Sequence, residues 1–544
     1  MTPTTARPRT VRIQELAHRR RWAILGVLCL SLLMVVIDNT IVNVALPTLS
    51  ADLDASTTEL QWIVDAYTLV FSALLLAFGH FGDRFGRKLA LQLGLVLFAG
   101  TSALAAMATT STQLIGARAL MGVGAAFVFP ATLAILVNVF ADRRERATAI
   151  GIWSACTGLA VALGPVTGGY LLEHFAWGSI FLVNLPLAAI AIVASWFLIP
   201  TSRDPQTGAL DHLGLALSAA GVALIVWSII EAPHRGWTDL TVMLAGAVGL
   251  GLVALFVAWE RRVDHPLLDV TLFRNARFSA ASVSVAAAFF ALFGFIFLIT
   301  QYLQLVQGYS PLEAGLRTLP FAIATGVTSP LAIVAMHRWG SKLVVAGGLA
   351  VMAVGFVIAS RIEVDTSYVG LTLISMVTIA IGLGLTTGPA TESIMGALPE
   401  DKAGVGSAVN DTTRELGGTL GVAVVGSVFA SIYGASLVTA LQPLGLPQDI
   451  LDAAGESMAA ALATAQALPG DLSAEVVRAA QESFVDGLAT GSLVAAAVAM
   501  AGSLVAVAFL PARQSRMRHE PVSTGSPDAR PAVTASLSSP EVKA

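Results

Sequence analysis

Ionisable side chains inside long apolar segments are the first residues of this sequence that could do chemistry. Asp38, Asp65 and Arg118 are three of them. A charge within a membrane-spanning helix is costly unless it is paired or hydrated, so such residues mark ion or proton pathways. A carboxylate that faces an arginine can alternate between ion pairing and protonation, which is the chemistry that proton coupling requires. The alternative is a structural ion pair that only orients helices.

The three residues fall at a similar depth if each lies on a spanning helix. Asp38 stands about fifteen residues from the cytoplasmic end of its segment, or roughly 23 Å at 1.5 Å per residue. Asp65 and Arg118 stand about six residues from the external ends of theirs, or roughly 9 Å. We therefore predict that all three lie in the outer half of the membrane and take part in proton coupling. For Asp65, a solvated position near the external end is the alternative.

A second group of charges shares one helical face. Asp411 lies three residues before Arg414 and four before Glu415, so the three side chains point the same way on a helix. Their net charge is negative by one, which suits a cationic or proton-bearing cargo. A self-neutralised cluster near the cytoplasmic mouth is the alternative. Glu392 ends the preceding apolar segment, and we add it to this predicted substrate site, with a hydrated interfacial position as its alternative.

A glycine-rich, basic segment joins the second and third apolar segments. Two glycines allow a sharp turn, Asp83 can cap the next helix, and the basic residues favour the cytoplasm. A topology anchor is the simplest interpretation, but the density of fixed features favours a gating role. The predicted gating residues are Gly79, Gly82, Asp83, Arg84, Gly86 and Arg87.

The fifth apolar segment carries a proline flanked by glycines. Proline removes a backbone hydrogen bond, and glycines permit close helix approach. The sequence therefore predicts a kinked, tightly packed hinge, although glycine-rich packing is common in membranes. Its residues are Gly164, Pro165, Gly168 and Gly169.

The composition indicates that most of this chain lies in a membrane and not in water. Of its 544 residues, 56% are hydrophobic and 12% charged, whereas an ordinary soluble domain has roughly 25% charged residues. This excludes the common soluble enzymes, and such hydrophobicity excludes disorder over most of the length. The net charge of -4 argues against a nucleic-acid partner. The two cysteines, Cys29 and Cys156, stand in apolar runs and imply no disulfide framework. We expect no enzyme activity, cofactor or metal site.

Fourteen segments are long and apolar enough to span a bilayer, which takes about 20 residues each. The fold class is therefore an all-α polytopic membrane protein. We expect two six-helix halves with a two-helix insert between them. The expected parts are a basic cytoplasmic head (1–22), an N-terminal six-helix half (23–199), a two-helix insert with a cytoplasmic linker (200–277), a C-terminal six-helix half (278–511) that includes an external loop (433–487), and a disordered cytoplasmic tail (512–544).

Charge asymmetry predicts the orientation. With both termini in the cytoplasm, 25 of the 31 Lys and Arg residues fall in cytoplasmic segments and four in external ones. A repeat supports the two halves, because Arg84–Leu89 after the second segment and Arg338–Leu343 after the tenth are both basic turns that contain glycine. Paired halves are typical of secondary transporters. No phosphate-binding G-x-x-x-x-G-K-[ST] loop occurs, so the energy must come from a gradient.

These features resemble the 14-span drug:proton antiporters of the major facilitator superfamily, over nearly all of residues 23–511. The run Asp38–Pro47, with Asn39 and Asn43, looks like the family's first-helix motif, whose aspartate is implicated in proton coupling. We assign the two asparagines to the substrate site. The Gly79–Lys88 segment looks like the superfamily signature that gates the cytoplasmic side.

Two more motifs and one departure complete the resemblance. Arg118 with its neighbouring glycines looks like the arginine motif tied to proton transfer, and Ala160–Gly169 looks like the motif of exporters that run as antiporters. Family members often carry glutamine where this chain has Glu415, so an acid there implies a changed preference for cargo charge.

The resemblance implies proton-coupled efflux of drugs or antibiotics by alternating access in the bacterial cytoplasmic membrane. The implied partners are a hydrophobic, cationic small molecule, protons and the lipid bilayer. The rival hypothesis is a translocator of lipids or cell-envelope metabolites, or a facilitator, that is not coupled through Asp38. The alanine-rich external loop 433–487 is expected either to form a helical hairpin over the outer mouth or to be a tolerated insertion.

Overall fold

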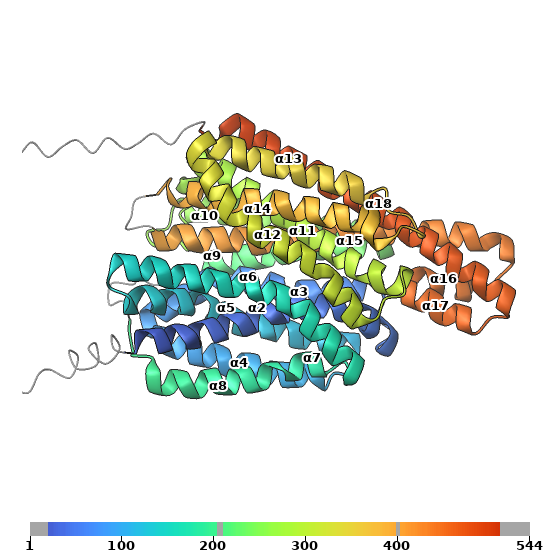
Figure 1. Cartoon of the computed structure of the whole chain (residues 1–544), viewed down its shortest axis with the longest axis horizontal. Coiled ribbons are helices and arrows are strands. Elements are labelled where there is room, and N and C mark those ends of the chain that lie inside the picture. The colour runs from blue at the N-terminus through green and yellow to red at the C-terminus, as the bar shows by residue number, and fades with distance from the viewer. Residues whose placement is uncertain (1–19, 204–209, 399–402, 512–544) are drawn as a thin grey trace, which may run out of the picture.

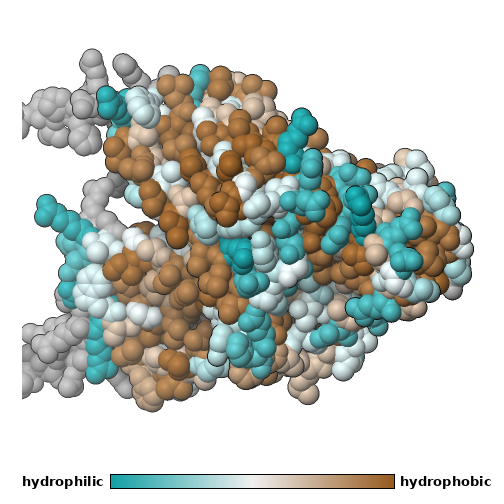
Figure 2. All heavy atoms as spheres, turned by 45° about the vertical axis from the view of Figure 1, so that its right-hand side comes forward, coloured by the Kyte–Doolittle hydropathy of each residue, from teal (hydrophilic) through white to brown (hydrophobic). Residues whose placement is uncertain are grey.

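A computed structural model describes residues 20–203, 210–398 and 403–511. Fourteen helices in these ranges are long and apolar enough to cross a membrane, which confirms the predicted number. The tail and nearly all of the head predicted from the sequence lie outside the described residues. Apolar side chains dominate the body of the molecule, with polar ones at its left edge and in a band toward the opposite end (Figure 2). This surface is that of a multi-pass membrane protein.

The first six spans form one bundle, drawn from blue to green in Figure 1. Helix α2 packs mainly on α6, α3 and α4 pack on α5, and α8 packs on α2 and α4. The bounds are α2 (Arg21–Asp52), α3 (Thr57–Phe85), α4 (Arg87–Ala106), α5 (Ser111–Val139), α6 (Arg143–His174), and α7 (Ser179–Leu182) with α8 (Asn184–Leu198) as the sixth span.

The last six spans repeat this packing. Helix α11 packs on α15, α12 and α13 pack on α14, and α18 packs on α11 and α13, as α8 does on α2 and α4. The elements are η1 (Val270–Arg274), α11 (Ala276–Gln301) with η2 (Tyr302–Val306), α12 (Pro311–Trp339), α13 (Ser341–Ala359), η3 (Tyr368–Thr372) with α14 (Leu373–Met395), α15 (Ala403–Leu441), and α18 (Gly470–Phe509).

Local sequence explains why α3 and α12 correspond. Each begins at a serine that forms a reciprocal capping box with a glutamate three residues on, Ser56 with Glu59 and Ser310 with Glu313. Each ends at a glycine with positive φ, 126° in one helix and 88° in the other, where a side chain would be strained. The next helix starts at once in both cases, so the two halves share the same tight turn.

A helical hairpin extends beyond the bundles at the right of Figure 1. Helices α15 and α18 have 39 and 40 residues, or roughly 60 Å each, twice the thickness of the hydrocarbon layer. Between them lie η5 (Gln442–Leu444), α16 (Gln448–Glu456) and α17 (Met458–Gln466). The segment expected as a loop at 433–487 is thus helical, whereas its role stays a prediction.

The halves meet at the end of the bundle that carries the hairpin. The Thr300 hydroxyl donates to the Asn43 carbonyl at 2.8 Å, and the Thr57 hydroxyl of α3 donates to the Glu456 carbonyl of the hairpin at 2.9 Å. At Gly169, an added Cβ would lie 2.5 Å from the Leu312 Cα, so α6 and α12 are in backbone contact there. The two halves are therefore closed against each other at the end that carries the hairpin.

The two-helix insert consists of α9 (His212–Arg235) and α10 (Leu240–Glu260). It docks on the rest of the chain through a backbone carbonyl that lacks a helical donor because of a proline. Pro233 has no N–H, so the Ile229 carbonyl one turn earlier loses its helical donor. The Ser427 hydroxyl of α15 donates to this carbonyl at 2.8 Å, and the Gln61 amide of α3 lies 3.4 Å from the same hydroxyl. One serine thus links the insert to both halves.

Replacing Ser427 with alanine is expected to loosen the insert. The Ile229 carbonyl, which is half-buried, would remain without a donor, and this costs at most about 1–3 kcal/mol. Hydrogen–deuterium exchange should then rise in α9 and change little in α5. The matched control is Ser431→Ala, whose hydroxyl accepts from the exposed Trp237 ring at 3.3 Å. Equal exchange in both variants would contradict a docking role for Ser427.

Candidate functional site

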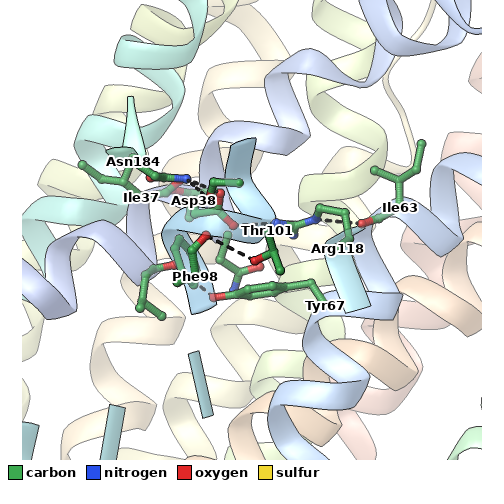
Figure 3. Close-up of polar contacts among 12 residues, drawn as sticks. Ile37, Asp38, Ile63, Tyr67, Phe98, Thr101, Arg118 and Asn184 are labelled. Atoms are coloured by element: carbon green, nitrogen blue, oxygen red, sulfur yellow. Dashed lines mark hydrogen bonds and ion pairs between the residues drawn. The ribbon is translucent and has the colours of Figure 1, made fainter. Parts of the chain in front are cut away.

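A buried ion pair joins the first and fourth spans. The Arg118 Nη1 of α5 lies 2.5 Å from the Asp38 Oδ2 of α2, and both side chains are fully buried. Figure 3 shows the two side chains pointing toward each other. Sequence spacing predicted their shared depth, and the structure adds direct contact. A fully buried pair is costly unless further hydrogen bonds compensate for lost hydration.

Neighbouring helices supply those hydrogen bonds. Asn184 at the start of α8 donates through Nδ2 to the second carboxylate oxygen of Asp38 at 2.8 Å. On the other side, Arg118 Nε donates to the Ile63 carbonyl at 3.1 Å, and its guanidinium carbon lies 4.3 Å from the centre of the Tyr67 ring. Within the described residues, Arg118 Nη2 has no partner. One donor of the arginine is therefore available for a change of partner.

Asp65 lies apart from this pair. It is fully buried, and neither carboxylate oxygen has a hydrogen-bond partner among the described residues. Gln61 and Thr68 lie four residues before and three after it, on the same helical face. Gln61 Nε2 donates to the Val422 carbonyl of α15 at 3.2 Å, and the Thr68 and Thr419 hydroxyls are 3.0 Å apart. Asp65 therefore faces the seam between α3 and α15, and the solvated alternative does not apply in this conformation.

The charges on α15 form a looser cluster in the C-terminal half. Arg414 Nη1 lies 3.9 Å from Asp411 Oδ1, and its guanidinium carbon lies 4.5 Å from the centre of the Phe289 ring. Glu415 Oε2 has no partner in the described parts of the chain. One turn after Glu415, the Thr419 hydroxyl donates to the Glu415 carbonyl and lies 3.0 Å from the Thr68 hydroxyl of α3. Tyr67, the residue before Thr68, lies against Arg118, so this stretch of α3 contacts both the ion pair and α15.

The remaining predicted substrate residues occupy different positions. Asn39 and Asn43 are buried on α2, and Asn43 belongs to the external contact described above. Glu392 is half-buried on α14. Its neighbour Thr391 donates to Asn410 Oδ1 at 3.1 Å, which brings this end of α14 against the charged turn of α15.

The predicted gating segment is mostly helical. Gly79, Gly82, Asp83 and Arg84 lie in the last two turns of α3, and only Gly86 lies between helices. The prediction that Asp83 caps the next helix is wrong, because Gly86 occupies the cap position without a side-chain bond. Asp83 instead accepts from Arg87 Nε at 2.8 Å.

Arg87 extends these contacts to other elements. Its Nη1 lies 3.4 Å from the Ala134 carbonyl of α5, and its backbone N–H donates to the Ser202 carbonyl at 3.0 Å. Gly79 lies against Pro130 of α5, where an added Cβ would make an ordinary van der Waals contact with the proline Cβ at 3.5 Å. The segment therefore connects α3, α4 and α5 to the linker that leads into the insert.

The glycines of α6 face two different partners. An added Cβ at Gly164 would overlap the Thr40 side chain of α2, and one at Gly168 would lie 2.6 Å from Ile41. Gly169 faces Leu312 of α12 in the other half. Pro165 lies between them inside α6. The predicted hinge is thus the place where α6 passes from contact with its own half to contact with the other.

Sequence reasoning missed Asn184, Ser102 and Tyr67. Asn184 Nδ2 lies 3.3 Å from the Ser102 hydroxyl of α4 as well as bonding Asp38. Asn184 stands inside an apolar run, Ile180–Pro186, and a polar amide in such a run was the available signal. No comparable signal marked Ser102 or Tyr67, since their role depends on how α3 and α4 are rotated.

Replacing Asn184 with alanine is expected to destabilise the N-terminal half. A hydrogen bond to a charged group contributes about 1.5–3 kcal/mol, and the Asp38 oxygen would lose its donor. The thermal unfolding midpoint of the purified protein should fall measurably. Ser102→Ala is the matched control, because it removes only the 3.3 Å contact to Asn184. A larger loss in Ser102→Ala than in Asn184→Ala would contradict this role.

Comparison with known proteins identifies relatives along most of the chain. The multidrug efflux pump LfrA of Mycolicibacterium smegmatis is 38% identical over 511 residues, which cover 93% of this chain and 98% of the relative. The methyl viologen resistance protein SmvA of Salmonella typhimurium is 35% identical over 472 residues, which cover 86% of this chain and 93% of the relative. The tetracenomycin C resistance and export protein of Streptomyces glaucescens is 30% identical, with 90% and 91% covered.

Solved structures agree on the fold. A bacterial homologue of the human lysosomal transporter Spinster, in an inward-facing, occupied conformation, superposes with a TM-score of 0.62 at 16% identity and covers 90% of this chain and 97% of that one. Such transporters are not enzymes. The model of the Major Facilitator Superfamily matches residues 28–422, and the fourteen spans fit the drug:proton antiporter type. The chain belongs to the major facilitator superfamily.

Proposed function

We propose that this protein exports hydrophobic, cationic compounds across the bacterial cytoplasmic membrane in exchange for protons, by alternating access. The buried Asp38–Arg118 pair is the observation that carries the proposal. Relatives named for multidrug efflux, methyl viologen resistance and tetracenomycin C export support the direction of transport and the class of cargo. The Lys and Arg asymmetry supports cytoplasmic termini.

The closed external side and the formed ion pair together define one step of the cycle. In this step Asp38 is ionised, Arg118 neutralises it, and the cytoplasmic side admits cargo. After reorientation, a proton from outside neutralises Asp38 and releases Arg118, whose Nη2 is already without a partner among the described residues. Protonation removes the attraction that holds the pair, because a neutral carboxyl no longer balances the guanidinium charge. Cargo leaves, and the protonated carrier returns.

In this proposal Asp65 is a second carboxyl group that binds and releases a proton. An ionised carboxylate buried without a partner is very costly, so Asp65 holds a proton in the conformation described. It loses that proton only when the seam between α3 and α15 opens to water. Gly79–Arg87 acts as the cytoplasmic gate. Gly164–Gly169 is the hinge at which α6 bends as its contacts with the two halves change.

The substrate site of the proposal lies on α15 and faces Tyr67. Asp411 and Glu415 provide negative charge for a cationic cargo, and Arg414 keeps the site from holding any cation too tightly. Phe289 offers an aromatic face that already stacks on Arg414, as a cationic drug would use it. Glu392, Asn39 and Asn43 complete the proposed lining on α14 and α2.

The test is ethidium efflux from drug-hypersensitive cells that produce the wild type or Asp38→Asn, with and without a protonophore. We expect loss of efflux in the variant and in the uncoupled wild type, at equal membrane abundance. Asp54→Asn is the matched control, since Asp54 lies in the external turn after α2. Efflux that survives both treatments would favour the rival translocator or facilitator, in which the acids are structural ions.

A further inference from the structure

The only two cysteines of the chain meet between α2 and α6. They are 127 residues apart in the sequence, at positions 29 and 156. Gly168 lies against Ile41, which is the same offset of 127 residues, and both helices run outward from the cytoplasm. The register between the two helices therefore brings the cysteines to the same level, twelve residues closer to the cytoplasm.

Side-chain size and direction bring the thiols together. Cys156, Ala160, Gly164 and Gly168 follow one another at intervals of four, which places them along one ridge of α6. The glycines of this ridge contact α2, so Cys156 faces α2 as well. Cys156 packs against the buried apolar cluster that contains Cys29, α2 packs on α6, and both thiols are free.

The pair is open on one side. Cys29 is buried, whereas Cys156 is half-buried. On the same two turns of α6, Ile152 and Leu159 are exposed. A small apolar reagent that enters from the membrane or from the cytoplasmic side can therefore reach Cys156 first and Cys29 next.

Two thiols held close on separate helices form a bidentate soft ligand. No group of three or more metal-ligating side chains occurs in the described ranges, which disfavours tetrahedral metal sites. Trivalent arsenic needs only two thiols, and soft ligands suit it. An organoarsenic oxide forms two As–S bonds while both S–H bonds and the As=O bond break. The two protons and the oxygen leave as water, and arsenic stays trivalent.

We propose that Cys29 and Cys156 form a dithiol site for trivalent organoarsenicals, and that its occupation fastens the cytoplasmic part of α6 to α2 and stops transport. The second clause rests on the proposed function. Pro165 and the glycines beside it lie about two turns beyond Cys156, where α6 leaves α2 for α12. A bridge below that point prevents α6 from moving relative to α2 as the external contact opens.

The binding arm uses the purified full chain with phenylarsine oxide and intact mass spectrometry. We expect one adduct on the wild type that survives excess monothiol and is removed by dimercaptopropanol. Neither Cys29→Ser nor Cys156→Ser should keep an adduct through the monothiol wash, because a single As–S bond exchanges. A wash-resistant adduct on either single variant, or none on the wild type, would overturn the site.

The transport arm uses proton-driven ethidium uptake into inverted vesicles. We expect at least a tenfold loss of the wild-type rate with phenylarsine oxide, reversed by dimercaptopropanol, and no loss in Cys29→Ser/Cys156→Ser. If the wild type carries the adduct and still transports normally, the proposed inhibition of transport is refuted, whereas the arsenical site itself stands. If no vesicle transports ethidium, the proposed function fails, while the binding arm still decides the site.

Discussion

Replacing Arg118 with alanine is expected to cost about 3–5 kcal/mol of stability and to abolish transport. The cost arises because Asp38 would remain buried as an unpaired charge, which is worse than having no pair at all. Asn184 alone cannot compensate, since it supplies one donor to one oxygen. Thermal unfolding of the purified protein and its abundance in membranes measure the first effect, and ethidium efflux measures the second.

A double variant separates the structural role of this pair from its role in coupling. Asp38→Asn with Arg118→Gln removes both charges, so it should recover most of the stability that Arg118→Ala loses. Efflux should remain absent, because no carboxyl is left to exchange a proton at this position. If the double variant exports ethidium in a protonophore-sensitive way, the pair only orients α2 and α5, and the coupling site lies elsewhere.

Replacing Gly169 with valine is expected to shift the carrier roughly 5- to 150-fold toward a state that is open on the external side. A Cβ at this position would lie 2.5 Å from the Leu312 Cα and from the Pro311 carbonyl oxygen, both of them backbone atoms that cannot rotate away. Overpacking of this kind costs about 1–3 kcal/mol, and the clash exists only while α6 and α12 are in contact.

The measurement is labelling of a single external reporter cysteine at Ser457, in a background with Cys29→Ser/Cys156→Ser. Ser457 lies 3.3 Å from Ser50 across the closed side, so opening should speed its labelling. Gly158→Val is the matched control on the same helix, because an added Cβ there meets nothing within 4 Å. Equal labelling in the two variants would show that Gly169 does not hold the external side closed.

Depth was predictable from the sequence, whereas the direction of a side chain around its helix was not. The rise per residue places Asp38, Asp65 and Arg118 at one level, and the pair indeed forms. Asp65 shares α3 with Ile63 and Tyr67, which both contact Arg118. Two residues turn the helix by about 200°, so Asp65 points to the opposite side. Only the packing of α3 against α5 fixes which side faces the arginine.

Elements that depend on apolar length or on residues close together in the sequence were predicted well. Apolar length gave the fourteen spans, and the turn glycines marked the repeat that the capping boxes of α3 and α12 reinforce. Asp83 shows where prediction from neighbouring residues fails, because the N–H groups of α4 and the Arg87 side chain compete for its carboxylate. Capping needs the carboxylate near the first free N–H of α4, but α3 continues past Asp83 and brings Arg87 within 2.8 Å instead.

The ion pair lies in the first half of the chain and the acids of α15 lie in the second, and in the proposed exchange this division limits how tightly the proton and cargo fluxes can be linked. Asp38 and Arg118 are both on helices of the first half, so a change of protonation there reaches the second half through contacts between the halves. The hydroxyl contact of Thr68 with Thr419 is one of them. If this contact is loosened, the proposed exchange is expected to slip, so that protons flow without cargo while both sites remain intact.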